Sequence, residues 1–174
     1  TNQTVDLIGF FGPLILLITN IYNLWTQKLY LIGYFVFLLI NSAVNKSLKS
    51  IFKEPRPYDE INIISGEIHY GADVYGMPSG HAQSVSFSLI YLYLVQKSIW
   101  LLILNTIILL LTVIQRWNYR KHTIEQLLIG TMVGIICAIS SYYIVKYGIE
   151  NNKDIYILLY PANNIYVMYI NVSK

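Results

Sequence analysis

Residues 29–52 read LYLIGYFVFLLINSAVNKSLKSIF. The stretch begins as a continuous apolar run, and it is longer than the roughly 20 helical residues that cross a bilayer. Its last turns are polar and carry Asn41, Asn45, Lys46 and Lys49. We therefore expect a membrane-spanning helix that leaves the hydrocarbon region with a group of polar and basic side chains at its carboxyl-terminal end.

The composition of the whole chain agrees with a membrane protein. Of its 174 residues, 55% are hydrophobic and 12% are charged, and the mean hydropathy is +0.50. A soluble domain usually carries about 25% charged residues. A larger core does not explain the difference, because a chain of this size buries only about 70% of its unfolded surface. The net charge of +3 is small and spread out, so we expect membrane lipids and no nucleic acid as partners.

Four further stretches are apolar and about as long as a bilayer requires. They lie at about 5–25, 79–96, 99–114 and 123–147. The dipeptide Gly12-Pro13 predicts a kink in the first, of a kind that membrane helices tolerate. Gly130 and Gly134 have the spacing of a close helix–helix contact in the last.

The connections complete the expected architecture. Residues 53–78, between the second and third helices, are rich in proline, glycine and charge and are longer than a simple connector needs. Residues 150–174 are apolar in part but are interrupted at Pro161, so we expect an interfacial or strand-like tail. The sequence predicts an all-α fold: a polytopic transmembrane bundle of about five spanning helices with one long loop, in a single domain over residues 1–174.

Three polar segments lie at the ends of these apolar stretches. They are Lys49-Ser-Ile-Phe-Lys-Glu-Pro-Arg-Pro57, Met77-Pro-Ser-Gly-His81 and Gln115-Arg-Trp-Asn-Tyr-Arg-Lys-His-Thr-Ile-Glu-Gln126. Successive spanning helices alternate in direction, so the three segments fall on one face of the membrane. The amino terminus is expected on that face too, and the carboxyl terminus on the other.

The first two segments carry residue types that bind a phosphate. Lys49 and Arg56 are seven residues apart, which is about two helical turns if the helix continues, so both can face one pocket. Ser79 is a natural N-cap, and Gly80 lets a ligand approach the backbone closely. The backbone N–H groups at this helix start can bind an anion, and His81 in the first turn would touch that anion.

The third segment adds a second histidine. Arg116 can place its planar guanidinium on phosphate oxygens. His122 opens the last helix, and Gln126 lies one turn further on the same face, where its carbonyl oxygen can hold one ring nitrogen. A nucleophilic imidazole needs such an acceptor so that its other nitrogen is available to attack. Glu125 is a stronger acceptor, but it lies about 100° from Gln126 around a helix.

The other charged residues near the segments are expected to have plainer roles. Glu54 should pair with a nearby cation, and His69 should be a surface histidine. Lys53 should extend to the membrane interface, while Arg120 and Lys121 should be solvated or pair with acidic headgroups. The chain lacks the dense His/Asp/Glu clusters of a typical three-ligand metal site. We therefore expect no metal and no other cofactor.

At these residues the chain resembles the type-2 phosphatidic acid phosphatase superfamily of membrane lipid phosphatases. Its signature is K-x6-R-P, then P-S-G-H, then S-R-x5-H-x3-D, and the resemblance covers about residues 45–134. Gln115 stands where the signature has serine, and Gln126 where it has aspartate. The matching positions are Lys49, Arg56, Pro57, Pro78, Ser79, Gly80, His81, Arg116 and His122.

The segment from His122 to Gln126 is similar to the HT-x-x-Q pattern of dolichyl-diphosphatases. These enzymes remove the terminal phosphate of dolichyl diphosphate, with their site facing the lumen of the endoplasmic reticulum. The resemblance implies that His122 attacks phosphorus to form a phosphohistidine, and that His81 protonates the leaving oxygen and then activates water, with no metal. The groups that it implies for holding the phosphate oxygens are Lys49, Arg56, Arg116 and the amides of Ser79 and Gly80.

On this basis we expect an integral, multi-pass membrane phosphatase that acts on a polyprenyl diphosphate, in the endoplasmic reticulum or an equivalent internal membrane. Two alternatives remain open. One is a general lipid monophosphate phosphatase acting on phosphatidate or phosphatidylglycerophosphate. The other is a catalytically silent protein that binds lipid phosphates or has a structural role. Gln115 and a body one helix short of the superfamily's usual six favour this second alternative.

Overall fold

The computed structural model describes residues 3–63 and 69–151. These residues form an all-helical bundle, as predicted. The tail expected from residue 150 lies outside the described residues, except for Glu150 and Asn151, which end the last helix. The helices are α1 (Gln3–Phe10), α2 (Gly12–Leu24), α3 (Lys28–Phe52), the short 3₁₀ helix η1 (Gly71–Val74), α4 (Gly80–Gln96), α5 (Ile99–Asn118) and α6 (Ile124–Asn151).

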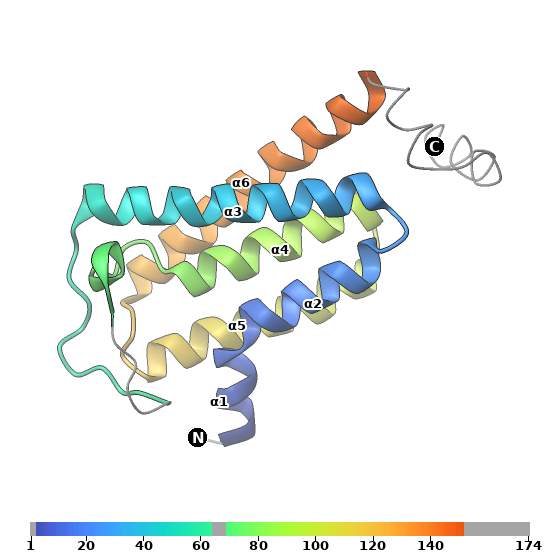
Figure 1. Cartoon of the computed structure of the whole chain (residues 1–174). Coiled ribbons are helices and arrows are strands. Elements are labelled where there is room, and N and C mark those ends of the chain that lie inside the picture. The colour runs from blue at the N-terminus through green and yellow to red at the C-terminus, as the bar shows by residue number, and fades with distance from the viewer. Residues whose placement is uncertain (1–2, 64–68, 152–174) are drawn as a thin grey trace.

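Helix α4 is the centre of the bundle and packs against α2, α3, α5 and α6 (Figure 1). Its closest neighbour is α6, and the contact depends on the two glycines that the sequence singled out. A Cβ built on Gly134 would collide with the carbonyl oxygen of Gln83 and the hydroxyl of Ser86, and one built on Gly130 would lie 2.6 Å from the carbonyl oxygen of Ser79. The predicted close helix contact is therefore confirmed.

Three helices are long and apolar enough to cross a membrane within the described residues: α3, α5 and α6. The pair α1 and α2 passes the same test together, as one broken span, which gives up to four. The remaining expected span, α4, has 17 residues. Most of its side chains on every face are buried by neighbouring helices, including Gln83, Ser86 and Ser88.

The first expected span is broken more sharply than a tolerated kink. Helices α1 and α2 meet at Phe11 with a bend of 62°. Pro13 lies in the first turn of α2, where its ring fits a helix start but cannot continue the preceding helix. Helix α1 consequently leaves the line of α2 and packs against α5 (Figure 1).

Four helix ends meet at one end of the bundle: the end of α3, the start of α4, the end of α5 and the start of α6 (Figure 1). The alternation of helix directions predicted this arrangement. The long loop covers the same end and folds back on itself through a bridge between Pro55 and Tyr75. Its backbone is fixed further by bonds from Gly76 N to the Glu54 carbonyl (2.8 Å) and from Ile61 N to the Tyr119 carbonyl (2.9 Å).

Candidate active site

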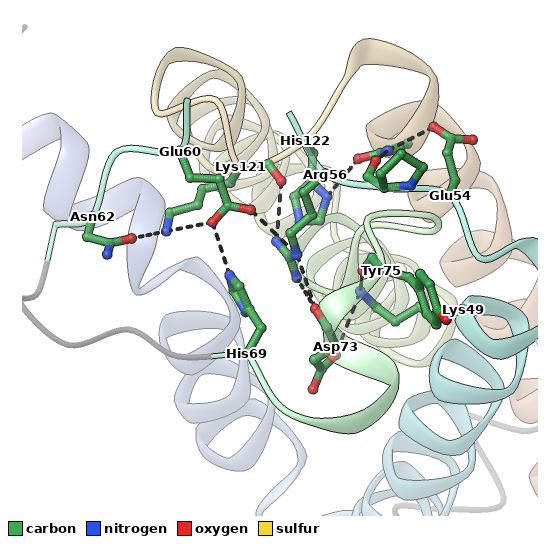
Figure 2. A network of polar contacts seen from close by, with 12 residues as sticks. Lys49, Glu54, Arg56, Glu60, Asn62, His69, Asp73, Tyr75, Lys121 and His122 are labelled. Atoms are coloured by element: carbon green, nitrogen blue, oxygen red, sulfur yellow. Dashed lines mark hydrogen bonds and ion pairs between the residues drawn. The ribbon is translucent and has the colours of Figure 1, made fainter. Parts of the chain in front are cut away.

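Helix α3 carries Lys49 in its last turn and ends before Arg56, the other candidate phosphate-binding cation of the first segment. Lys53 adopts a left-handed conformation (φ 50°) that closes the helix, so Arg56 is carried by the loop and not by a further helical turn. Lys49 is 1% exposed, and its ammonium donates to the Tyr75 carbonyl at 2.5 Å and lies 3.7 Å from an Asp73 carboxylate oxygen. The two cations still face one region, because the loop turns back over the helix end (Figure 2).

The short helix η1 supplies a contact that the sequence did not indicate. The backbone carbonyl of Asp73 accepts from Nε of Arg56 at 3.1 Å and from Nη2 at 2.9 Å. A third Arg56 bond, from Nη1, reaches the Lys121 carbonyl at 3.3 Å. Asp73 thus joins Lys49 and Arg56, and the guanidinium is held between the long loop and the turn that leads into α6.

Glu60 is the centre of a second charged group, also in the loop (Figure 2). Its carboxylate lies 3.6 Å from Nε of Arg56, 3.3 Å from Nζ of Lys121 and 3.1 Å from Nε2 of His69. Burial acts to raise the pKa of Glu60, but His69, Arg56 and Lys121 outweigh it and hold the pKa below its usual value. Lys121 was expected to be solvated or to pair with headgroups, and this expectation was wrong, because Lys121 is 1% exposed and is also bonded to Asn62. His69, expected at the surface, is partly exposed and has a carboxylate partner.

His122 and Gln126 make the contact that their spacing predicted. The Gln126 amide oxygen lies 3.2 Å from Nδ1 of His122 and also accepts from the Thr123 N–H at 3.3 Å. The amide nitrogen donates to a Glu54 carboxylate oxygen at 2.8 Å and to the Pro55 carbonyl at 2.9 Å. Glu54 was expected to pair with a cation; the structure gives its carboxylate an amide partner.

These contacts fix which way the Gln126 amide faces. A flipped amide would point its N–H groups at the Thr123 N–H and its oxygen at the Pro55 carbonyl, and neither backbone group can change its role. The oxygen therefore faces His122, so Nδ1 of His122 is the protonated nitrogen. Its Nε2 is left with a lone pair, which is the tautomer that a nucleophilic imidazole requires.

The surroundings of His122 also keep it neutral. The side chain is 2% exposed. Burial, and then the nearby cations Arg56, Arg116 and Lys49, hold the pKa of His122 well below its usual value. The opposing effect of the Gln126 contact is smaller. Near neutral pH the ring is therefore uncharged and able to donate its lone pair.

The start of α4 is held differently from the expectation. Ser79 occupies the N-cap position, but its side chain makes no capping bond. Its backbone N–H donates to the Gln126 carbonyl at 3.0 Å, so that amide is occupied and is not part of an anion site. The Ser79 hydroxyl is buried and has no hydrogen-bond partner among the described residues. The hydroxyl, with the amides from Gly80 to Ala82 that precede the first bond within the helix, is what this helix start offers an anion.

Helix α1 reaches the site through Phe10. The His81 ring hydrogen bonds to the Phe10 backbone, and the two rings lie 6.1 Å apart. The guanidinium of Arg116, which is 4% exposed, lies 5.8 Å from the centre of the same phenyl ring. The bend at Phe11 makes both contacts possible, and the sequence pattern, read as one kinked span, did not indicate them.

The two histidines line different cavities. One cavity of about 400 Å³ is bounded by His81 and by residues of α1, α2 and α3 that include Phe10, Leu14 and Lys46. The other, of about 340 Å³, is bounded by His122 and by loop and α5 residues that include Trp117.

Gln115, which differs from the signature, lies in α5 facing α1. It is 2% exposed, and neither its amide oxygen nor its amide nitrogen has a hydrogen-bond partner among the described residues. A Cβ built on Gly9 of α1 would lie 2.6 Å from the Gln115 Cβ. The glutamine is thus a contact residue between α1 and α5.

As for metals, residues 3–63 and 69–151 hold no group of three or more His, Cys, Asp or Glu side chains placed to bind an ion. The carboxylates and histidines of the region instead contact cations, amides and backbone groups. The arrangement therefore brings cations, a helix start and two histidines to one end of the bundle, and these groups are suited to phosphoryl transfer.

No curated protein matches this chain. Among solved structures, it is similar to the crystal structure of the first transmembrane PAP2-type phosphatidylglycerolphosphate phosphatase from Bacillus subtilis. The identity is 18% and the TM-score 0.58, over 86% of this chain and 76% of that one, which is a similarity of fold. The sequence pattern of the PAP2 superfamily matches residues 30–150, and the chain therefore belongs to that superfamily.

Proposed function

We propose that this protein is a membrane lipid phosphatase that removes the terminal phosphate of a polyprenyl diphosphate through a phosphohistidine on His122. The observation that carries the proposal is the fixed Gln126 amide, because it leaves a neutral His122 with its Nε2 lone pair beside several cations. Membership of the PAP2 superfamily supports a lipid phosphatase in general. The HT-x-x-Q pattern favours the polyprenyl diphosphate as substrate.

In the first step, the lone pair of His122 Nε2 forms a bond to the terminal phosphorus. Lys49, Arg56 and Arg116, with the Ser79 hydroxyl and the first amides of α4, neutralise charge on the equatorial oxygens. The bond from this phosphorus to the bridging oxygen breaks, and its electron pair stays on that oxygen. His81 donates a proton to it, because the negative charge of the bound phosphate favours the protonated imidazole. The lipid monophosphate then leaves.

In the second step, a water molecule attacks the phosphorus of the phosphohistidine and gives its proton to His81. The bond between phosphorus and Nε2 breaks, and the electron pair returns to the ring. Inorganic phosphate is released and both histidines regain their starting protonation states. The proton of His122 stays on Nδ1 throughout and is donated to the Gln126 oxygen, as in other nucleophile–orienter pairs.

The position of the cavities supports a lipid leaving group on the His81 side. In-line displacement places the leaving oxygen opposite the nucleophile, and His81 lines the cavity that contains apolar residues of α1 and α2. Lys46 lines the same cavity. Its ammonium is suited to the second phosphate of a diphosphate lipid, which a monophosphate substrate lacks.

A second candidate substrate is phosphatidylglycerophosphate, and it is favoured by the similarity of fold to a phosphatase named for that lipid. The test is phosphate release by the purified protein in detergent micelles with excess EDTA. Polyprenyl diphosphate, phosphatidylglycerophosphate and phosphatidate would be assayed in parallel. We expect the highest kcat/KM for the diphosphate. We also expect an alkali-stable, acid-labile phosphoprotein when the terminal phosphate is labelled.

Lys46→Met provides the matched comparison. It should raise KM for the diphosphate more than for phosphatidate. A higher kcat/KM for a monophosphate, with no selective effect of Lys46→Met, would replace the polyprenyl proposal by the second candidate. Absence of release from all three lipids by a folded protein would favour the silent alternative, and activity only after a metal is added would remove the metal-free mechanism.

A further inference from the structure

Glu54 is the carboxylate nearest in the hydrogen-bond network to the proposed nucleophile, although it does not touch it. Its Oε1 accepts from Nε2 of Gln126 at 2.8 Å, and the oxygen of the same amide lies 3.2 Å from His122 Nδ1. The amide thus stands between an anion and the imidazole, and the three side chains form one chain of bonds. Figure 2 shows Glu54 and His122 on opposite sides of this contact.

Backbone hydrogen bonds at Glu54 and next to it fix its position in the loop, and they therefore support its contact with Gln126. The Glu54 carbonyl accepts from the Gly76 N–H at 2.8 Å, and the neighbouring Pro55 pairs with Tyr75. These bonds involve only main-chain atoms, so they do not compete with the bond that the Glu54 carboxylate accepts from the Gln126 amide. Gly76 lies directly against that amide, since a Cβ built on it would be 2.6 Å from Nε2.

A negative charge at this place has a chemical use. When Nε2 of His122 bonds to phosphorus, the ring becomes positively charged while its Nδ1–H continues to donate to the Gln126 oxygen. The superfamily signature has an aspartate at position 126, which would meet that charge directly. Here a neutral amide occupies the position, and the loop carboxylate behind it is the group able to polarise the amide.

We propose that Glu54 is a positioning residue for the phosphoryl transfer, acting on His122 through the Gln126 amide. The proposal rests on the proposed function, because it concerns the same nucleophile. In this arrangement the signature's single aspartate is replaced by a pair, with the amide orienting the ring and Glu54 supplying the charge. Glu54 binds neither substrate nor water in the reaction.

Other charged groups also face His122 and affect its protonation. They are the cations Lys49, Arg56 and Arg116, all of which lower the pKa of His122. Glu125 is adjacent to Gln126 in sequence, but its side chain is exposed. Glu54 is therefore the carboxylate whose removal should act on His122 through a defined contact.

The first experiment is single-turnover kinetics on polyprenyl diphosphate. Glu54→Gln should lower the rate of the chemical step by about tenfold to a hundredfold, with little change in KM, because the loss is that of an orienting contact. The matched control is Asp59→Asn, which neutralises an exposed carboxylate of the same loop that pairs only with Arg120 among the described contacts. That control should keep the wild-type rate.

The second experiment repeats the change in a different background. With Gln126→Asp, a carboxylate faces His122 directly and Glu54 becomes a second negative charge beside it. Glu54→Gln should then raise the rate severalfold, since the new amide can donate an N–H to the introduced carboxylate. One substitution would thus slow the wild type and speed the Gln126→Asp variant, which a purely structural role for Glu54 does not produce.

The outcomes separate the inference from the proposed function. A wild type that releases no phosphate from any lipid tested overturns the proposed function. An active wild type whose rate is unchanged by Glu54→Gln overturns the role of Glu54 alone. An equal loss in both backgrounds, or a loss accompanied by a broadened elution peak in detergent, assigns Glu54 to loop structure and overturns it as well.

Discussion

Gly76 packs against the side-chain amide of Gln126, with no room for a side chain between them. A Cβ built on Gly76 would be 2.6 Å from Nε2 and 2.7 Å from Cδ of that amide. The amide cannot move aside at low cost, because all of its hydrogen-bonding positions are used by His122, Thr123, Glu54 and Pro55. The long loop therefore sets the position of the group that holds the proposed nucleophile.

Gly76→Ala should consequently reduce activity without removing any catalytic group. The methyl displaces the Gln126 amide and weakens its hold on His122, so we expect a tenfold or greater loss in the single-turnover rate, of the order seen for lost orienting contacts. The measurement is single-turnover phosphate release with the folded state checked by size exclusion. Gly148→Ala is the control, since a Cβ there meets no atom within 4 Å. Equal rates for the two variants would contradict the packing argument.

The two histidines should respond differently to the leaving group. His122→Ala removes the nucleophile and should abolish turnover of every substrate. His81→Ala removes a proton donor, and the loss should be largest for a poor leaving group. An activated aryl phosphate should therefore restore the rate of His81→Ala much more than that of His122→Ala.

The check is the ratio of rates for aryl phosphate and lipid diphosphate in each variant. If a folded His122→Ala protein keeps steady-state activity, another residue is the nucleophile. Equal rescue of both variants would remove the distinction between nucleophile and proton donor.

The sequence predicted the parts of the fold that depend on periodicity and length. The ends of the apolar stretches placed three polar segments on one face, and the structure brings Lys49, His81 and His122 to that end of the bundle. The contact between His122 and Gln126 followed from their spacing. Such features depend on local geometry, which a single sequence carries.

The contacts made by the loop could not be predicted in the same way. Asp73, Glu60 and the partner of Glu54 depend on where residues 53–78 cross the bundle end, and no repeat in the sequence encodes that path. The bend at Phe11 was underestimated for a related reason. A proline predicts that a helix is interrupted, but the angle depends on the packing of α1 against α5.

The pH profile tests the cations around His122. The ring must be neutral to attack, and burial with Arg56, Arg116 and Lys49 holds the pKa of His122 well below its usual value. In a plot of kcat/KM against pH, the acidic limb should therefore lie well below the usual pKa of a histidine. Lys49→Met removes one positive charge, which favours the imidazolium, raises the pKa and moves this limb to higher pH.

The comparison uses one substrate for both proteins, so its own ionisation affects both profiles equally. Lys28→Met, an exposed cation at the opposite end of α3, should leave the acidic limb in place. A limb that stays fixed in Lys49→Met, or moves to lower pH, would show that another group controls it.

Two buried glutamines give the last prediction, because they differ in what their amides contact. Gln83 is fully buried and donates to the Asn41 backbone (2.8 Å) and side chain (2.9 Å), while it accepts from Asn45 at 2.8 Å. Gln115 is as deeply buried, but both of its amide atoms lack a partner among the described residues. The two positions therefore carry the same buried side chain, with its amide hydrogen bonded at Gln83 and without a described partner at Gln115.

Replacement by methionine keeps the shape and removes the amide. Gln83→Met removes the donor to Asn41 Oδ1, at a cost of about 1–3 kcal/mol for that oxygen, and it leaves Asn45 Nδ2 with the Pro78 carbonyl as its remaining acceptor among the described contacts. Gln115→Met removes two buried polar atoms that no described residue satisfies, so it should be neutral or stabilising. With about 2–4 °C per kcal/mol for a chain of this length, the thermal midpoints in detergent should separate by several degrees. If Gln115→Met is destabilised as much as Gln83→Met, the Gln115 amide binds water or a lipid headgroup beside Arg116. The departure from the signature serine would then belong to the site and not to the contact between α1 and α5.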